Sequence, residues 1–289
     1  MHLDPPSPAL IQDEPFAKYL IQPGKPANLA SRPTDASDAT IDKDEAKDRT
    51  DEHLKELVDL QEKFYADGRL GMLVCLQAMD AGGKDSTIRR CFGPINPQGV
   101  EVTSFKVPTE LERRHDFLWR HQLAVPAEGM IGIFNRSHYE AVLVERVKDL
   151  VPEPVWRARY DHINHWESLL YAGGTVVVKI YLHLSKKEQA ERFRDRLTRR
   201  DKWWKFSEHD LAERKRWDGY QGAFEDALTR CSTLVAPWYA IPADQKWYRD
   251  YLITGLMLRL MKALPSEYPQ PPAGMADRVD DFLAELKSD

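Results

Sequence analysis

From Arg69 onward, short and almost uninterrupted apolar runs alternate with stretches of helical pattern, and this alternation narrows the choice of fold more than any other feature. Continuous apolar runs are typical of parallel strands covered on both faces, whereas half-exposed strands alternate apolar and polar residues. Strands that alternate with helices along the chain predict an α/β fold, a doubly wound parallel sheet of about five strands flanked by helices. The runs lie at residues 70–76, 100–105, 130–134, 175–184 and 233–241.

The chain divides by composition into an extension, an α/β domain and a tail. The extension is rich in proline and charged residues, so we expect it to be partly ordered. The domain opens with a helix whose end is marked by Asp67 and Gly68. We also predict a short helix in the tail. The three parts are residues 1–50, 51–265 and 266–289.

Several classes of protein are excluded by the composition. The longest apolar runs, such as residues 71–79 and 175–184, fall far short of the roughly 20 residues that a membrane helix needs. No basic and apolar signal segment opens the chain, so we expect a cytoplasmic protein without a membrane partner. Cys75, Cys91 and Cys231 are isolated, which predicts buried reduced thiols and neither disulfides nor a structural zinc site.

Charge is distributed unevenly along the chain. Between Lys186 and Arg216 there are 12 Lys/Arg and 7 Asp/Glu, a local balance of +5, although the whole chain carries −5. The rest of the chain therefore carries −10, which argues against a protein that coats nucleic acid with its whole surface. The asymmetry predicts a confined polyanion site. Because the segment at about 186–230 is too long and too charged for one crossover helix, we expect a helical lid of two helices joined near 202–207.

A glycine-rich turn follows the first predicted strand, in the sequence QAMDAGGKDSTIRRCF of residues 77–92. A strand, such a turn and a helix form the P-loop arrangement, in which backbone N–H groups surround phosphates and a lysine neutralises them. The turn departs from the pattern GxxxxGK[ST], so the prediction depends on its context; the alternative is a tight turn without a ligand. The candidate phosphate-binding residues of this turn are Ala81, Gly82, Gly83, Lys84, Asp85 and Ser86, and Asp80 precedes them.

Asp80 stands inside this turn, where bound phosphates would repel a lone carboxylate. Its presence is explained if a metal ion or a phosphate hydroxyl lies between the two negative groups. The alternative is that Asp80 closes the loop as an Asx turn.

Polar residues end the second and third predicted strands. Ligand-facing groups emerge from the carboxyl ends of parallel strands, so Asn135 and Arg136 should lie beside the P-loop. Asn135 is neutral where nucleotide enzymes often place a metal-binding aspartate, and Arg136 could bind a phosphate. The alternative for Arg136 is a structural salt bridge with Glu140 or Glu145. Lys106, at the end of the second strand, adds positive charge to the same edge.

A stripe of cations crosses the predicted lid. Its first three arginines recur at i, i+4 and i+7, the spacing of one helix face. The alternative is a solvated face, which is what most charge runs form. Trp203 and Trp204 lie among the cations and could stack a base or pack the lid against the body. The candidate polyanion-binding residues are Arg192, Arg196, Arg199, Arg200, Lys202 and Lys205.

Taken together, these residues resemble the polyphosphate kinase 2 family over roughly residues 50–265. Five motifs occur in the family's order, which is far more specific than any single motif. The resemblance implies a P-loop kinase fold with a helical lid and magnesium-dependent transfer of phosphoryl groups between inorganic polyphosphate and nucleotides. The motifs are DAGGK (80–84), KVPTE (106–110), FNRSHYEAVLVERV (134–147), KWWKFSEHDLAERKRWDGY (202–220) and APWYAIPADQKW (236–247).

The resemblance also implies roles for individual residues. Lys84 and the loop amides would hold phosphates, Asp80 would bind Mg²⁺, and Arg136 with the lid arginines would hold phosphates of the donor or acceptor. Many family members have aspartate where this chain has Asn135. The Asn-Arg-Ser-His-Tyr-Glu form resembles the subgroup that phosphorylates both nucleoside mono- and diphosphates.

We therefore predict a polyphosphate:AMP/ADP phosphotransferase that acts by direct in-line transfer, with Asp80, Lys84, Asn135 and Arg136 as its catalytic residues. Its partners would be inorganic polyphosphate and nucleotides, with no nucleic acid, and we expect a homo-oligomer. One alternative is an ATP-dependent nucleoside or nucleotide kinase on the same fold. The other is a non-catalytic module that binds polyphosphate or nucleic acid through its lid.

Overall fold

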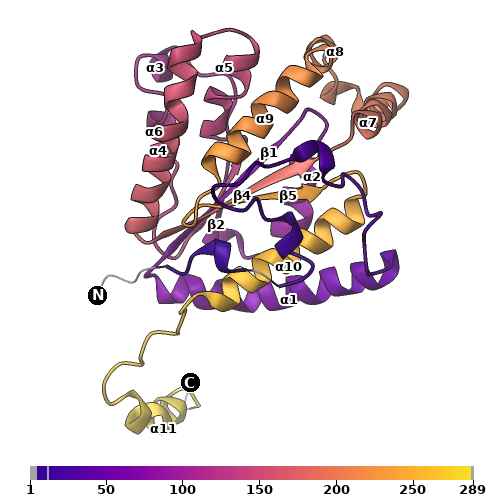
Figure 1. Cartoon of the computed structure of the whole chain (residues 1–289). Coiled ribbons are helices and arrows are strands. Elements are labelled where there is room, and N and C mark those ends of the chain that lie inside the picture. Colours follow the sequence, from indigo (N-terminus) through magenta and orange to yellow (C-terminus); the bar gives the residue numbers. More distant parts are fainter. Residues whose placement is uncertain (1–4, 12, 288–289) are drawn as a thin grey trace.

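A five-stranded parallel sheet forms the centre of the computed structural model, which describes residues 5–11 and 13–287 (Figure 1). The strand order is β2-β3-β1-β4-β5, and every neighbouring pair is parallel. Helices lie on both faces, so the predicted doubly wound fold is confirmed. The strands are β1 (Gly71–Ala78), β2 (Val100–Ser104), β3 (Ile131–Asn135), β4 (Thr175–His183) and β5 (Trp238–Pro242).

The central strands are covered on both faces, as their continuous apolar runs predicted. Every residue of β1 and of β4 is buried. Met72 and Val74 of β1 belong to the core beneath α1 (Lys43–Asp67) and α10 (Lys246–Ala263). The alternate residues of β1 pack toward α6 (Glu153–Ala172) on the opposite face. Burial on both faces fixes where β1 can end, and this end positions the glycine-rich turn.

The last strand begins later than the sequence predicted. β5 starts at Trp238, although the apolar run starts at Thr233. Thr233 instead closes a turn with Ala236, because the Thr233 N–H donates to the Ala236 carbonyl. Pro237 has no N–H to donate to a neighbouring strand, so regular pairing can begin only after it.

The first helix begins earlier than predicted. Asp42 caps α1, because its side chain accepts hydrogen bonds from the N–H groups of Asp44 and Glu45. The charged run that follows is therefore helical, and the predicted domain boundary at residue 50 falls inside α1. The helix ends where predicted, with Gly68 at φ 63° as its C-cap.

The N-terminal arm packs against the body. Phe16, Tyr19 and Leu20 are buried in the core beneath α1 and α10. The Ile21 N–H donates to the Trp238 carbonyl at 2.8 Å, which places the arm along β5. Residues 1–4 and 12 of the predicted extension, and 288–289 of the predicted tail, lie outside the described residues. Short helical turns of the arm span Pro8–Leu10, Ala17–Tyr19 and Leu29–Ser31.

The predicted lid contains fewer residues than expected. Two helices, α7 (Lys186–Thr198) and α8 (Glu208–Lys215), are joined by a 3₁₀ segment (Arg200–Lys205) and lie at one end of the molecule (Figure 1). We call this segment, residues 186–215, the lid. The following helix, α9 (Trp217–Cys231), instead packs on the core, because its buried residues recur at helical spacing.

The remaining helices are short or peripheral. α11 (Met275–Glu285) has no buried residue and lies apart from the body (Figure 1). Within the described ranges, no helix combines the length and apolar character needed to cross a membrane. The short helices are α2 (Lys84–Thr87), its π-helical continuation (Ile88–Phe92), α3 (Glu110–Arg113), α4 (Trp119–Gln122) and α5 (Val144–Val147), with 3₁₀ turns at Pro97–Gly99 and His138–Ala141.

A charged cluster is buried between the sheet and α6. Lys179 of β4 and Glu167 of α6 form an ion pair in which both side chains are 0% exposed. His138 and Tyr139 also contact the Glu167 carboxylate, at 3.0 and 2.9 Å. Burial alone would raise the pKa of Glu167, but the Lys179 charge and the hydrogen bond from His138 hold it below its usual value.

This cluster predicts a large loss of stability when one charge is removed. Glu167→Ala should lower the free energy of unfolding by about 3–5 kcal/mol, because it leaves Lys179 as a buried charge without its carboxylate. Glu153→Ala is the matched control, since it breaks an exposed ion pair on the same helix and should cost at most about 1 kcal/mol. Urea unfolding followed by circular dichroism measures both, and equal losses would contradict the prediction.

Candidate active site

Two glycines are required by the geometry of the turn that follows β1. A Cβ added to Gly82 would lie 2.4 Å from the Ala78 Cβ and 2.7 Å from the Met79 carbonyl oxygen. Gly83 has φ 102°, and an added Cβ there would lie 2.5 Å from Nη1 of Arg249. Ala81 adopts the left-handed region as well, at φ 60°, although it is not glycine. The chain therefore turns sharply between β1 and α2.

Lys84 lies at the first position of α2 and turns back toward the strand end. Its Nζ donates to the Ala78 carbonyl at 3.1 Å. Burial and the nearby Arg136 guanidinium lower the pKa of Lys84. Because anionic phosphates would compensate both effects, the position suits a phosphate-binding lysine.

The end of β3 contacts this turn at two points. Arg136 Nη2 lies 3.3 Å from Oδ1 of Asp80, and Asn135 Nδ2 donates to Oδ1 of Asp85 at 2.8 Å. The side chains of Arg136 and Asp80 stay partly exposed, at 43% and 30%. Glu145, one of the two alternative partners of Arg136, instead pairs with Arg159 at 2.6 Å. The structure thus brings Asn135 and Arg136 beside the P-loop, as predicted.

The backbone of Arg136 explains this placement. Its φ is 62°, a left-handed conformation, and its N–H donates to the Leu76 carbonyl of β1 at 3.2 Å. Burial alone would lower the pKa of Arg136, but Glu140 and Asp80 raise it, so the guanidinium stays charged. A charged, half-exposed guanidinium beside the turn can bind a phosphate in the forked geometry that arginine favours.

The carboxylates of the site fit a magnesium ion held partly by its substrate. Mg²⁺ is usually bound through one or two carboxylates together with phosphate oxygens and water. Asp80 and Asp85 flank the turn and both lie near Lys84 and Arg136. No group of three or more His, Cys, Asp or Glu in residues 5–11 and 13–287 is arranged to hold a metal by itself. When bound, the ion would neutralise phosphate charge.

Lys106 and most of the lid cations lie farther from the turn than Asn135 and Arg136 do. Lys106 is exposed and follows Phe105, whose N–H donates to the Asn135 carbonyl at 3.1 Å, so it lies on the same edge of the sheet. The lid cations do not share one helix face, because α7 ends at Thr198 and Arg199 has φ −107°. Four of them have carboxylate partners within the lid: Arg192 with Glu188, Arg196 with Asp210, Arg199 with Asp201 and Lys202 with Asp195.

Two of the lid cations lie over tryptophan rings. The Arg200 guanidinium is 5.5 Å from the Trp203 ring centroid, and the Lys205 ammonium is 4.8 Å from that of Trp204. The tryptophans are 52% and 78% exposed, which disfavours the alternative that they pack the lid against the body. Indole N–H groups of both rings donate to backbone carbonyls of the lid itself.

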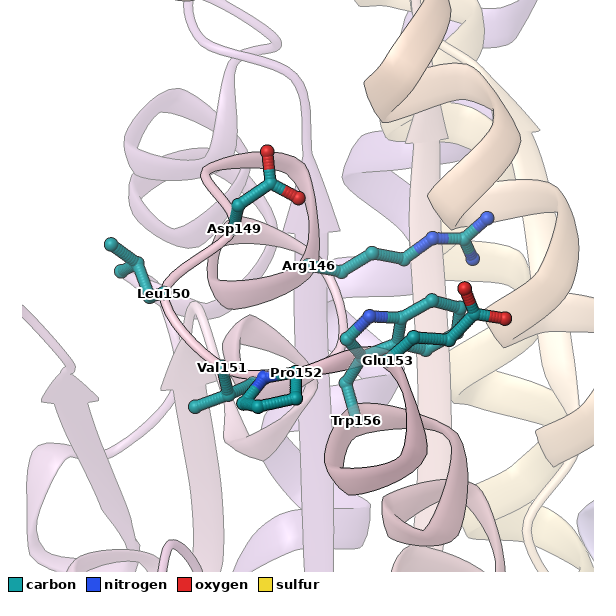
Figure 2. A pocket seen from close by; sticks show the side chains of 7 residues that line it. All are labelled: Arg146, Asp149, Leu150, Val151, Pro152, Glu153 and Trp156. Carbon is teal, nitrogen blue, oxygen red and sulfur yellow. The ribbon is translucent and has the colours of Figure 1, made fainter.

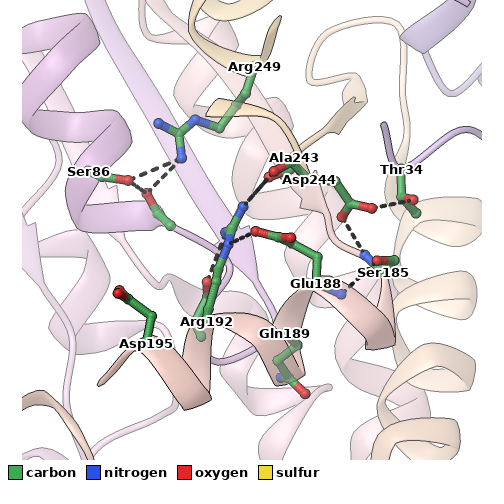
Figure 3. A network of polar contacts seen from close by, with 12 residues as sticks. Thr34, Ser86, Ser185, Glu188, Gln189, Arg192, Asp195, Ala243, Asp244 and Arg249 are labelled. Atoms are coloured by element: carbon green, nitrogen blue, oxygen red, sulfur yellow. Dashed lines mark hydrogen bonds and ion pairs between the residues drawn. The ribbon is translucent and has the colours of Figure 1, made fainter. Parts of the chain in front are cut away.

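Arg192 differs from the other lid arginines because it turns inward. Its Nη1 donates to the Ala81 carbonyl at 2.9 Å, and its Nη2 donates to the Ala243 carbonyl (Figure 3). Its Nε donates to Glu188 at 2.9 Å. All three nitrogens thus have protein acceptors, so Arg192 holds α7 against the P-loop.

Sequence reasoning missed two residues that contact the turn, Gln189 and Arg249, and a third, Arg214, that contacts Gln189. Gln189 donates to the Asp80 carbonyl at 2.8 Å, and Arg214 donates to Gln189 at 2.8 Å. Arg249 of α10 is 1% exposed and donates to Ser86 Oγ at 3.1 Å (Figure 3). No local motif marks them, because they reach the turn from helices more than a hundred residues away along the chain.

A pocket of the structure lies away from the predicted site residues. A pocket of about 440 Å³ lies instead around the start of α6, where Arg146 and Glu153 border Trp156 (Figure 2). None of its lining residues belongs to the P-loop, β3 or the lid. A polyphosphate chain is long and highly charged, so an open surface of cations suits it better than this pocket, which is bordered by the carboxylates of Asp149 and Glu153.

Comparison with known proteins identifies the family. The model of the polyphosphate kinase 2 family matches residues 40–269. The chain belongs to this family. The prediction from the five motifs is therefore confirmed, and the chain is a polyphosphate-dependent nucleotide kinase. This result disfavours both alternatives, the ATP-dependent kinase and the non-catalytic module.

Individual relatives of the polyphosphate kinase 2 family support the assignment. An AMP/ADP-polyphosphate phosphotransferase of Meiothermus ruber is 51% identical over 217 residues, which cover 75% of this chain and 81% of the relative. An ADP-polyphosphate phosphotransferase of Rhodopseudomonas palustris is 40% identical over 265 residues, or 88% and 92% of the two chains. The crystal structure of polyphosphate kinase 2 from Arthrobacter aurescens TC1 superposes with a TM-score of 0.89 at 37% identity, covering 96% of this chain and 97% of the other.

Lys84 gives the sharpest test of the P-loop. Lys84→Ala should lower kcat/KM by roughly 10²-fold or more, because it removes a preorganised charge that faces the phosphates. The melting temperature should change little, since the hydrogen bond of Lys84 Nζ goes to one backbone carbonyl, that of Ala78 at the end of β1. Steady-state kinetics and thermal melting measure the two effects. A variant that melts like the wild type and keeps more than half of its activity would refute the phosphate-binding role.

Proposed function

We propose that this polyphosphate kinase phosphorylates both AMP and ADP with inorganic polyphosphate as donor and Mg²⁺ as cofactor. The observation that carries the proposal is the pair of contacts between the end of β3 and the P-loop, Asn135 to Asp85 and Arg136 to Asp80. They gather two cations, two carboxylates and a carboxamide at one edge of the sheet. Phosphoryl transfer needs mainly such positioning and charge neutralisation.

Each residue has a distinct role in the proposed reaction. Lys84 and the backbone amides of the turn hold the phosphates near the transferred group, and Arg136 neutralises the negative charge that the phosphates bring. Asp80 and Asp85 would hold the magnesium ion. Ser86, with its hydroxyl between Gly83 and Arg249, keeps the turn in place.

The proposed transfer is direct and needs no covalent enzyme intermediate. His138 is fully buried and its Nε2 contacts Glu167, so no phosphate donor can reach it. His209 stands in the first turn of α8 on the lid surface, with no side-chain contact to the P-loop residues. A nucleophilic side chain is also unnecessary, because a phosphate oxygen of the acceptor can attack the transferred phosphoryl group in line.

Asn135 supports the acceptance of two acceptors. An aspartate there would place a third carboxylate beside Asp80 and Asp85, and it would repel an acceptor phosphate placed deeper in the site. The asparagine keeps an acceptor oxygen and adds N–H donors. Its Nδ2 already donates to Asp85, which fixes the carboxamide beside the turn. The name of the Meiothermus ruber relative points in the same direction.

We assign the polyphosphate chain to the exposed cations of the lid. Arg200 and Lys205 lie over the exposed tryptophan rings and, in the described part of the chain, have no ion-pair partner. Arg196, Arg199 and Lys202 must first exchange a carboxylate partner for phosphate. Cytoplasmic location and a homo-oligomer stay predictions, and the three buried free cysteines suit a reducing compartment.

The acceptor range is tested by Asn135→Asp. We expect the wild type to make ADP from AMP and ATP from ADP when polyphosphate and Mg²⁺ are supplied. The variant should lose kcat/KM for one acceptor at least about tenfold more than for the other, because a like charge acts differently on acceptors of different length. Chromatographic separation of the nucleotides measures both rates. Equal losses for AMP and ADP would show that Asn135 does not set the acceptor range.

The lid assignment is tested by the salt dependence of binding. Arg200→Ala should weaken polyphosphate binding and lower the slope of log Kd against log salt by about 0.7, the value for one lost contact to a single-stranded polyanion. Arg194→Ala is the matched control, since Arg194 lies on α7, is exposed and pairs with Glu191. Titration calorimetry at several salt concentrations measures both variants. Identical slopes for the two variants and the wild type would mean that Arg200 only forms a solvated surface.

A further inference from the structure

The first lid helix holds two consecutive carbonyl groups of the P-loop. Gln189 Nε2 donates to the Asp80 carbonyl at 2.8 Å, and Arg192 Nη1 donates to the Ala81 carbonyl at 2.9 Å. Gln189 is 1% exposed, and both residues project from the same stretch of α7 (Figure 3). The helix therefore fixes the backbone of the turn just before the two glycines.

These contacts decide where the turn directs its N–H groups. A trans peptide is planar, so a carbonyl turned toward α7 turns the following N–H away from α7. The bond from Gln189 to the Asp80 carbonyl therefore orients the Ala81 N–H. Ala81 adopts φ 60°, which costs energy for a residue with a Cβ and persists only where neighbouring contacts enforce it. Gln189 and Arg192 are such contacts.

Gln189 also contacts the second lid helix. Its Oε1 accepts a hydrogen bond from Arg214 Nη1 of α8 at 2.8 Å, and the same nitrogen donates to the Lys186 carbonyl at 2.8 Å. A continuous path thus runs from α8 through one side chain to the backbone of Asp80. A carboxamide suits this position, because its oxygen accepts from the guanidinium while its nitrogen donates to the carbonyl.

We propose that Gln189 is a positioning residue, which transmits the position of α8 to the phosphate-binding turn. The inference rests on the phosphate-binding role proposed for that turn. When Arg214 holds the Gln189 oxygen, the amide nitrogen is directed at the Asp80 carbonyl. The Asp80 carboxylate and the Ala81 N–H are then held in the arrangement that the phosphates require. A role limited to packing would need only the volume of the side chain.

The two ends of the path can be broken separately. Gln189→Glu keeps the size and the bond to Arg214 but loses the donor to the Asp80 carbonyl. Gln189→Met keeps the approximate volume of the side chain and loses both hydrogen bonds. Arg214→Met removes the hydrogen bond between α8 and Gln189 and leaves the one between Gln189 and the Asp80 carbonyl. Arg194→Met is the matched control on the outer face of α7. We expect kcat to fall about tenfold in all three test variants, with KM for the nucleotide within about twofold of the wild type and no change in the control.

The double variant Gln189→Met/Arg214→Met makes the test specific. If the two residues act as one path, its kcat should equal that of Gln189→Met, because the second substitution removes nothing further. Hydrogen exchange of the peptide that contains residues 79–83 supplies a readout independent of turnover, and we expect faster exchange in every test variant. Thermal melting shows that the variants are folded.

The outcomes separate this inference from the proposed function. A wild type that does not transfer phosphate from polyphosphate would refute the function, whereas the exchange measurement would still report on the path. An active wild type whose Gln189→Glu variant keeps its kcat within about twofold would overturn the inference. Multiplicative losses in the double variant, or unchanged exchange of the turn, would overturn it as well.

Discussion

The contacts between the carboxyl ends of β1 and β3 are the constraint on which the rest of the site depends. Arg136 pairs with Asp80 and Asn135 with Asp85, so two residues that end one strand hold the turn that follows its neighbour. Without these contacts, the carboxylates of Asp80 and Asp85 would lack the guanidinium and the carboxamide that hold them beside the turn. Because β1 is buried on both faces, the turn cannot move away from β3 without breaking the sheet. Bound phosphates would replace the carboxylates as partners of the cations, and the carboxylates become free for a metal ion.

Much of the fold could be predicted from patterns of residue types along the sequence. The apolar runs locate all five parallel strands, and Gly68 identifies the end of α1. The expected burial on both faces is wrong for β2, because this strand lies at the edge of the sheet and all of its residues are exposed or half-buried. The start of β5 was misplaced because Pro237 interrupts pairing inside an apolar run, and such a run cannot show where hydrogen bonding begins. The start of α1 was missed because a charged segment becomes helical through the Asp42 cap and later burial of its apolar face. The lid was extended too far, since only packing distinguishes α9 from the charged helices before it.

The site was predictable where its residues are local in sequence. Lys84, Asp80 and the glycines belong to one turn, and Asn135 with Arg136 follow from the rule that parallel strands present ligands at their carboxyl ends. Gln189, Arg214 and Arg249 were not predictable, because ordinary polar residues become significant only when tertiary structure brings them to the turn. Arg192 shows the same limit: its spacing placed it in a polyanion-binding stripe, yet its guanidinium binds backbone carbonyls.

The account rests on polyphosphate as the phosphoryl donor. The most direct measurement is ³¹P nuclear magnetic resonance of the wild-type protein with long-chain polyphosphate, AMP and Mg²⁺ and no other phosphoryl donor. The account predicts that the resonances of the terminal and internal phosphates of ADP and ATP grow while the polyphosphate signal declines, and that removal of Mg²⁺ stops both changes. Polyphosphate that stays intact in this mixture, while a parallel mixture with ATP in place of polyphosphate phosphorylates AMP, would contradict it.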